Sequence, residues 1–192
     1  MFRNRIRVVI TRYFEEPIVK VLQALKVTPT MVTIFGLMLT LGVGYLAAVD
    51  ELVIAGILML VSGPIDMLDG ALARRTGKDS MFGALLDSIC DRLGEGAVLF
   101  GLLILSYDKG SIMNVVLVFI AMVASFMVSY IRARGEGLGV KGEIGLMTRP
   151  ERLIVLSVGM LTGYLAISLI LVSVLSGITA GQRFVYISQR AK

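Results

Sequence analysis

Residues 66–91 of the chain read DMLDGALARRTGKDSMFGALLDSICD. Of the five aspartates in this stretch, four lie in or beside long apolar runs: Asp66, Asp69, Asp87 and Asp91. An ionisable side chain at membrane depth is costly to keep and usually has a function. At about 100° per residue, Asp66 and Asp69 lie roughly 60° apart on one helix, and Asp87 and Asp91 lie roughly 40° apart on another. The spacing therefore predicts two carboxylate pairs that can face each other.

Such an arrangement of carboxylates requires a cation. Four carboxylates that converge in a medium of low dielectric repel one another unless a positive charge neutralises them. Clustered carboxylate oxygens are the ligands that hard divalent ions such as Mg²⁺ and Mn²⁺ prefer. The chain has no histidine and a single cysteine, Cys90, which argues against an all-protein zinc site. The sequence therefore predicts a magnesium or manganese site, and it leaves proton abstraction to a carboxylate, a lysine or metal-bound water.

The whole chain has the composition of an all-α, polytopic membrane protein. Of its 192 residues, 56% are hydrophobic and 17% are charged, and the apolar residues come in long blocks. We expect six transmembrane helices, with a kink at Pro64 in the second and a break near Gly163 between the fifth and sixth. The windows are residues 31–49, 52–67, 81–107, 111–131 and 152–187, the last of which holds two passes.

A single membrane domain is expected to cover residues 1–192. Residues 1–28 alternate apolar side chains with arginines, which predicts an amphipathic helix on the membrane surface. Residues 29–192 are expected to form the transmembrane bundle.

The distribution of basic residues predicts the orientation in the cell membrane. Lysines and arginines precede the first span, follow the second and fourth spans, and gather near the end of the chain. The loops on the opposite side carry one base and three acids: Lys109, Asp50, Glu51 and Asp108. By the positive-inside rule, both termini and the aspartates are expected on the cytoplasmic side. The net charge of +5 reflects this asymmetry and gives no reason to expect nucleic-acid binding.

The fixed residues between Asp66 and Asp91 form the pattern D-x2-D-G-x2-A-R-x8-G-x3-D-x3-D. This pattern resembles the motif of the CDP-alcohol phosphatidyltransferases, without a departure at any fixed position. The resemblance implies an integral membrane enzyme with six helices that acts as a homodimer, in which an alcohol displaces CMP from a CDP-linked lipid. The chemistry agrees, because a pyrophosphate brings negative charge that metal ions bridge.

The resemblance also implies a role for each aspartate. Asp66 and Asp87 would be shared by two metal ions. Asp69 would complete one metal site and Asp91 the other. Asp91 would also be the catalytic base that accepts the proton of the incoming hydroxyl.

Other positions resemble those at which the family binds the CDP-lipid. They are Thr30, Met31, Val32, Thr33, Asp69, Gly70, Arg74, Ser80 and Gly83. Gly70 and Gly83 lack a Cβ, so the main chain can approach a nucleotide closely; the alternative is ordinary packing of small residues between helices. For Thr30 the alternative is a helix N-cap. Glu95 continues the aspartate stripe and is expected to pair with Arg92.

The acceptor is expected to meet arginines that lie outside the motif. Residues 129–134, 149–152 and 182–183 resemble the branch of the family that transfers to inositol phosphate, and the glycine-rich link over 135–145 is expected to be a flexible connection. The candidate ligands of the acceptor phosphate are Arg132, Arg134, Arg149, Arg152 and Arg183. Guanidinium groups bind phosphate in bidentate geometry. The alternative is that these arginines set the topology or reach lipid headgroups.

The sequence thus predicts a phosphatidyltransferase that acts on CDP-diacylglycerol or CDP-archaeol, with inositol phosphate as acceptor. Within the same chemistry, the alternatives are glycerol phosphate and then an uncharged alcohol such as serine or inositol. A cation transporter is the alternative from a different class, since carboxylates at membrane depth also mark ion pathways. An ion pathway, however, has no use for Gly70, Arg74 and Gly83 at their spacing.

Overall fold

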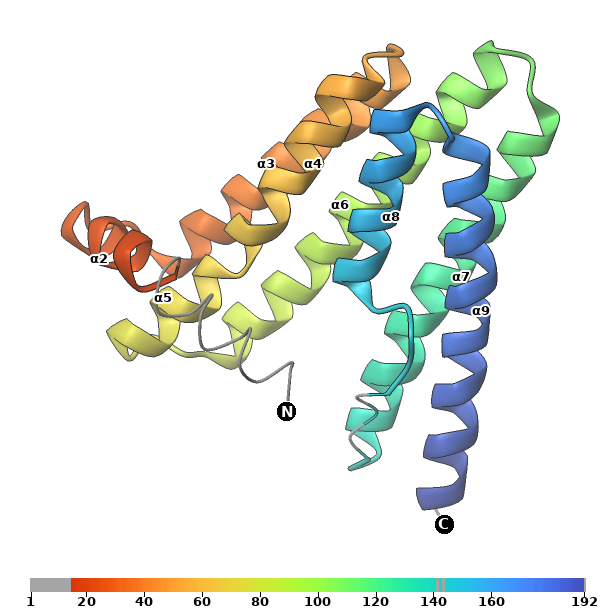
Figure 1. Cartoon of the computed structure of the whole chain (residues 1–192). Coiled ribbons are helices and arrows are strands. Elements are labelled where there is room, and N and C mark those ends of the chain that lie inside the picture. The colour runs from red at the N-terminus through yellow and green to blue at the C-terminus, as the bar shows by residue number, and fades with distance from the viewer. Residues whose placement is uncertain (1–14, 141, 143, 192) are drawn as a thin grey trace.

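The computed structural model describes residues 15–140, 142 and 144–191 of the chain, and every regular element in these ranges is an α-helix (Figure 1). The helices are α2 (Glu16–Ala24), α3 (Pro29–Ala48), α4 (Leu52–Asp66), α5 (Leu68–Thr76), α6 (Met81–Asp108), α7 (Ile112–Gly137), α8 (Arg149–Thr162) and α9 (Leu165–Arg190). Of the amphipathic helix predicted over residues 1–28, the first 14 residues lie outside the described part of the chain.

Four helical stretches of the described ranges are long and apolar enough to cross a membrane. They are Pro29–Ala48, Leu52–Thr76, Ile112–Gly137 and Leu165–Arg190. Helix α6 has 28 residues but carries charged side chains in its first half, and α8 has only 14 residues, fewer than the roughly 20 that usually span a bilayer. The predicted break at Gly163 is confirmed, because this glycine has a φ of 78° and ends α8.

The second span is interrupted next to the aspartates, near the predicted kink. Pro64 lies inside α4 and has no N–H to donate. Two residues later α4 ends, and the amide of Met67 bonds to the carbonyl of Pro64 at 3.3 Å, an i→i+3 bond in place of the α-helical one. Helix α5 then begins at Leu68 and ends at Gly77, which has a φ of 63°. The break places Asp66 and Asp69 on two short helical segments instead of one continuous face.

Close packing of α3 against α6 fixes the centre of the bundle. A Cβ added to Gly101 of α6 would overlap the main chain of Gly44 of α3, so the two helices approach each other through glycine. A buried apolar cluster continues this contact through Val43, Leu99 and Leu102. The positions of the α6 aspartates relative to α3 are therefore set by main-chain contact.

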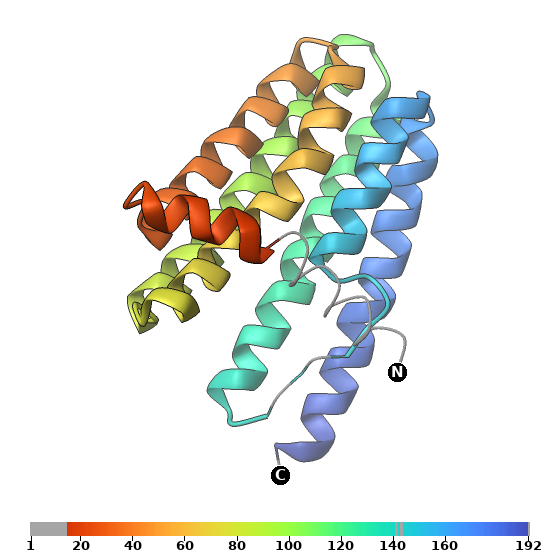
Figure 2. The ribbon, with the colours of Figure 1, turned by 60° about the vertical axis from the view of Figure 1, so that its left-hand side comes forward.

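The helix connections place the polar groups at one end of the bundle. The turns between α3 and α4, α6 and α7, and α8 and α9 lie together at the upper end in Figure 1. The opposite end holds the connection from α5 to α6, the end of α7 and the end of α9. Helix α2 lies against the lower ends of α3 and α4 in Figure 2, and its Val19 packs with Val32, Leu68 and Leu72. The ends of α4, α6, α7 and α9 that carry the predicted site residues thus share one side of the molecule.

Candidate active site

Three of the four predicted aspartates form one acidic group. Asp66 is the last residue of α4, and Asp87 and Asp91 are one turn apart on α6. Each offers a carboxylate oxygen, and the three oxygens lie within 4.8 Å of one another. A set of carboxylate oxygens alone suits a hard divalent cation. Asp66, Asp87 and Asp91 can therefore hold a metal ion.

Asp69 is oriented differently from the other three aspartates. Its Oδ2 accepts a hydrogen bond of 2.6 Å from the hydroxyl of Thr33, and its Oδ1 accepts one of 2.5 Å from the amide of Gly70. The residue is buried. Local and long-range donors thus fix its carboxylate on the side of α3, next to the acidic group but not within it.

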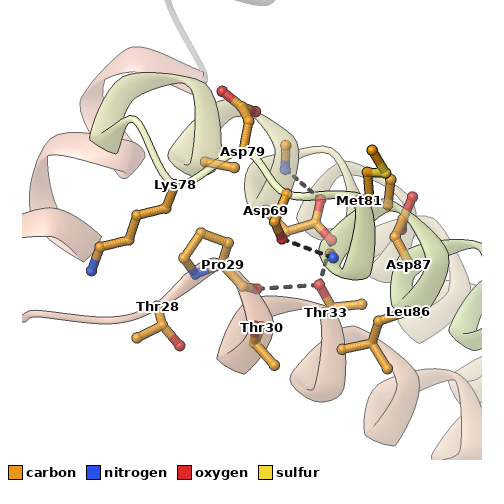
Figure 3. Close-up of a pocket in the computed structure, with 15 residues that line it drawn as sticks. Thr28, Pro29, Thr30, Thr33, Asp69, Lys78, Asp79, Met81, Leu86 and Asp87 are labelled. Carbon is orange, nitrogen blue, oxygen red and sulfur yellow. Dashed lines mark hydrogen bonds between the residues drawn. The ribbon is translucent and has the colours of Figure 1, made fainter.

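A cavity of about 790 Å³ opens beside Asp69, between the start of α3, α5 and the start of α6 (Figure 3). It brings together most of the residues predicted to bind the CDP-lipid: Thr30, Thr33, Asp69, Gly70, Ser80 and Gly83. In Figure 3, Thr33 and Asp69 point toward each other at its centre. The cavity therefore joins sequence segments more than 40 residues apart into one surface.

Three predicted CDP-lipid residues do not line this cavity. Met31 is 58% exposed, and Val32 is only 6% exposed because it packs in the apolar cluster with α2 and α5. The guanidinium of Arg74 lies over Gly70, where a Cβ would be 3.2 Å from its Nη1. The bare α-carbon of Gly70 thus gives room to this arginine.

The N-cap of α3 and two charged residues of the cavity differ from what the sequence predicts. The N-cap of α3 is Thr28, whose hydroxyl accepts from the amide of Met31 at 3.3 Å, so the alternative of a cap at Thr30 is wrong. Lys78 and Asp79 line the cavity although neither was predicted as a site residue. Lys78 is one of the basic residues that follow the second span. Its place between two helices of the motif was the signal that could have identified it.

A second cavity of about 250 Å³ lies on the other side of the acidic group. Asp87 and Asp91 line it, together with four of the five arginines predicted for the acceptor: Arg132, Arg149, Arg152 and Arg183. The fifth, Arg134, is exposed on α7 and does not line this cavity. The structure therefore gathers cationic side chains from α7, α8 and α9 around the carboxylates of α6.

Arg149 is directed at the aspartates. Its Nη1 is in contact with Oδ2 of Asp66 and lies 2.7 Å from Oδ1 of Asp91. As the first residue of α8, it brings this helix to the ends of α4 and α6. The contact balances part of the negative charge of the acidic group.

Arg152 is paired with Glu95, which corrects the expectation that Glu95 pairs with Arg92. The Nε of Arg152 donates to Oε1 of Glu95 at 2.5 Å, and Nη2 donates to Oε2 at 2.8 Å. Arg92 instead donates to the carbonyl of Ser88 at 2.7 Å and lies 3.8 Å from Asp91. Arg92 is close to Glu95 in the sequence, whereas the observed partner, Arg152, is 57 residues away.

Arg183 holds main-chain groups beside the second cavity. Its Nε donates to the carbonyl of Ile144 at 2.7 Å, and its Nη1 donates to the carbonyl of Val128 at 2.8 Å. The amide of Met147 donates to the hydroxyl of Thr179 at 3.0 Å. The expectation of a flexible link over 135–145 is therefore wrong at its two ends, because α7 runs on to Gly137 and Ile144 is tied to α9.

Comparisons with known proteins agree with this geometry. The model of the family CDP-alcohol phosphatidyltransferase matches residues 26–187. Archaetidylinositol phosphate synthase of Pyrococcus horikoshii is 40% identical over 170 residues, which cover 88% of this chain and 87% of the relative. Phosphatidylinositol phosphate synthase of Corynebacterium glutamicum is 43% identical over 154 residues, 77% of this chain and 69% of the relative.

Solved structures show the same fold. The crystal structure of Mycobacterium tuberculosis phosphatidylinositol phosphate synthase with CDP-DAG bound has a TM-score of 0.84 and 34% identity, and the match covers 91% of this chain and 93% of that one. The same enzyme in complex with manganese and citrate has a TM-score of 0.83 and 33% identity, with 91% and 89% covered.

Proposed function

We propose that this chain, which belongs to the CDP-alcohol phosphatidyltransferase family, transfers the phosphatidyl group of a CDP-linked lipid to inositol phosphate and releases CMP. One observation carries the proposal: Asp87 lines both cavities, so the cavity of the CDP-lipid motif and the arginine cavity meet at the acidic group. Donor and acceptor can thus reach the same carboxylates from opposite sides.

The larger cavity suits the CDP-lipid. It is lined by hydroxyl groups, by glycines and by Lys78, which together can bind a pyrophosphate and a nucleoside. A relative of the same fold has CDP-DAG bound, which supports this ligand. The lipid is diacylglycerol or archaeol, in line with relatives that are named for either product.

The smaller cavity suits an acceptor that carries a phosphate. Arg132, Arg149, Arg152 and Arg183 line it, and an alcohol without phosphate would need no such group of cations. Two relatives are named as synthases of inositol phosphate lipids, which supports inositol phosphate over glycerol phosphate. Arg134 is left out of this set because it lies outside the cavity.

The residues of the acidic group divide the chemistry between them. Asp91 is the base: it lines the acceptor cavity, and its carboxylate, which Arg149 contacts at Oδ1, can take the proton of the acceptor hydroxyl. The hydroxyl oxygen then attacks the lipid-side phosphorus, the bond from this phosphorus to the CMP oxygen breaks, and CMP leaves. Asp66, Asp69, Asp87 and Asp91 would hold two Mg²⁺ or Mn²⁺ ions. Bound there, such ions would supply positive charge beside the reacting phosphate.

The proposed setting is the cell membrane. We propose that α6 and α8 cross the bilayer together with the four apolar stretches, which gives six spans in a single domain over residues 1–192. Residues 1–28 would lie on the membrane surface, because their apolar side chains are interspersed with arginines. Both termini and the acidic group would face the cytoplasm, because the basic residues gather at that end. The enzyme would act as a homodimer, as the family resemblance implies.

A kinetic comparison of the arginines tests the assignment of the two cavities. Arg132→Ala and Arg183→Ala are expected to raise the KM for inositol phosphate about tenfold or more, with little change in the KM for the CDP-lipid. Arg134→Ala is the matched control, since it removes a neighbouring arginine outside the cavity. If the Arg183→Ala variant raised the KM for the CDP-lipid but not for the acceptor, the assignment would be wrong.

A further inference from the structure

We propose that Glu95 is a positioning residue for the acceptor: it holds Arg152 so that this guanidinium presents its remaining N–H groups to the acceptor phosphate. The proposal rests on the proposed function, since it assigns a role within the acceptor cavity. Glu95 lies one helical turn beyond Asp91 on α6, and Arg152 lies in the first turns of α8. The pair thus connects the helix of the aspartates to the helix of the arginines.

Both residues of the pair are buried. Glu95 is 3% exposed and Arg152 is 0% exposed. Two hydrogen bonds of 2.5 and 2.8 Å join the carboxylate to the Nε and Nη2 of the arginine, in the side-on bidentate arrangement. A buried ion pair adds little to stability compared with apolar residues of the same volume, because both charges are desolvated. A role in orientation explains its presence better than a role in stability.

The pair with Glu95 uses only some of the N–H groups of Arg152. A guanidinium has five N–H groups. Glu95 takes one on Nε and one on Nη2, and the carbonyl of Met147 takes one on Nη1 at 3.3 Å. One N–H on Nη1 and one on Nη2 therefore remain without a partner among the described residues. Phosphate oxygens accept two parallel bonds from such a pair of donors.

The acceptor cavity is the open space beside Arg152. Arg152 lines it, next to Asp91 and Arg183. Arg183 is held in a similar way, with its Nε and Nη1 bonded to main-chain carbonyls and its Nη2 left over. Both arginines are thus fixed by protein groups before an acceptor arrives. Fixing a ligand-binding side chain in advance lowers the entropy that binding costs.

Two effects of Glu95 on the acceptor oppose each other. Its negative charge repels a phosphate dianion, whereas its hydrogen bonds orient Arg152 toward that dianion. Arg152 cancels most of the repulsion, because opposite charges in direct contact form a nearly neutral pair at the distance of the cavity. Orientation is therefore expected to dominate, and loss of Glu95 should weaken acceptor binding.

The test uses the Glu95→Gln variant of the full-length enzyme. Glutamine keeps the volume and one oxygen acceptor, but its NH₂ group cannot accept the second N–H of Arg152. We expect the KM for inositol phosphate to rise about tenfold, while the KM for the CDP-lipid stays within about twofold of wild type. The Asp50→Asn variant is the matched control, because it removes an acid from a 2.7 Å pair with Lys109 at the other end of the bundle.

Two more variants keep the test decisive if Glu95→Gln folds poorly. Glu95→Asp retains the charge but shortens the side chain, and a smaller rise in the KM for inositol phosphate is expected. Arg152→Lys keeps the positive charge but lacks the planar guanidinium that can donate two parallel hydrogen bonds. It should reproduce the effect of Glu95→Gln. The double variant should be no worse than either single one, because the two residues act as a unit.

Several results would overturn the role of Glu95. An unchanged KM for inositol phosphate would show that the pair of Glu95 and Arg152 only stabilises the fold. A lower KM would show that the negative charge of Glu95 repels the acceptor phosphate. An equal rise in the KM for both substrates would show a general distortion. A wild-type enzyme that releases no CMP in response to inositol phosphate would instead refute the proposed function itself.

Discussion

The hydroxyl of Thr33 on α3 donates a hydrogen bond of 2.6 Å to Oδ2 of Asp69 on α5. Thr33 itself is held at the start of its helix, since its hydroxyl also lies 3.2 Å from the carbonyl of Pro29. This bond joins the first span to the aspartate motif that begins at the end of the second, and both residues line the larger cavity (Figure 3). The carboxylate of Asp69 is therefore oriented from outside its own helix.

Replacement of Thr33 by valine should impair use of the CDP-lipid. Valine has nearly the same shape but no hydroxyl, so a buried carboxylate oxygen of Asp69 loses its donor. We expect kcat/KM for the CDP-lipid to fall about tenfold, the effect of losing a hydrogen bond to a charged group. Steady-state kinetics with varied CDP-lipid measure this. Thr33→Ser keeps the hydroxyl and should remain close to wild type; equal losses in the two variants would contradict the account.

Replacement of Asp91 by asparagine should abolish most of the catalysis. Asparagine cannot accept the proton of the acceptor hydroxyl, and the loss of a general base typically costs about 10²–10⁴-fold in rate. The measurement is the rate of CMP release at saturating substrates and metal. Asp108→Asn, at the far end of the same helix, is the control and should be fully active. A wild-type rate in Asp91→Asn would show that another group is the base.

Addition of one methyl group at Gly44 should destabilise the bundle. A Cβ at this position would lie 2.5 Å from the carbonyl oxygen of Ala97 on α6, which forces the two helices apart. We expect Gly44→Ala to lower the midpoint of thermal unfolding in detergent by several degrees, as overpacking of about 1–3 kcal/mol does. Gly42→Ala is the control on the same helix, because its Cβ would meet its nearest atom at 3.9 Å. Equal midpoints for the two variants would contradict the close approach of α3 and α6.

Metal should bind to the acidic group and stabilise the fold. A ligand that binds only the folded protein raises its unfolding temperature, so Mn²⁺ or Mg²⁺ should raise the midpoint of thermal unfolding and EDTA should reverse the rise. The Asp87→Asn variant removes one of the three carboxylates that lie within 4.8 Å and should lose this response. A response that persists in this variant would place the metal elsewhere. Activity should follow the same pattern of loss with EDTA and recovery with metal.

The features that sequence could predict are those encoded within one or two helical turns. The one-turn spacing of Asp87 and Asp91 places both on one face of α6, and Gly163 ends α8 as a left-handed residue. The interruption near Pro64 also has a local cause, the missing N–H of proline. Local spacing and the motif pointed to three of the four aspartates that the structure brings together, Asp66, Asp87 and Asp91, but not to the separate orientation of Asp69.

The features that sequence could not predict depend on contacts between distant segments. Glu95 has Arg92 close by on its own helix, yet it pairs with Arg152 because α8 packs into the bundle at that height. Val32 belongs to the predicted CDP-lipid segment, but α2 and α5 cover it with apolar side chains. Nothing in the local pattern around Glu95 or Val32 states which helix will lie against it.

The most direct measurement offers the purified enzyme a labelled CDP-diacylglycerol, Mg²⁺ and a panel of acceptors: inositol phosphate, inositol, glycerol phosphate and serine. The arginines of the smaller cavity predict that inositol phosphate gives the labelled lipid product and that inositol does not. Product formation with glycerol phosphate or free inositol, and none with inositol phosphate, would contradict the central claim.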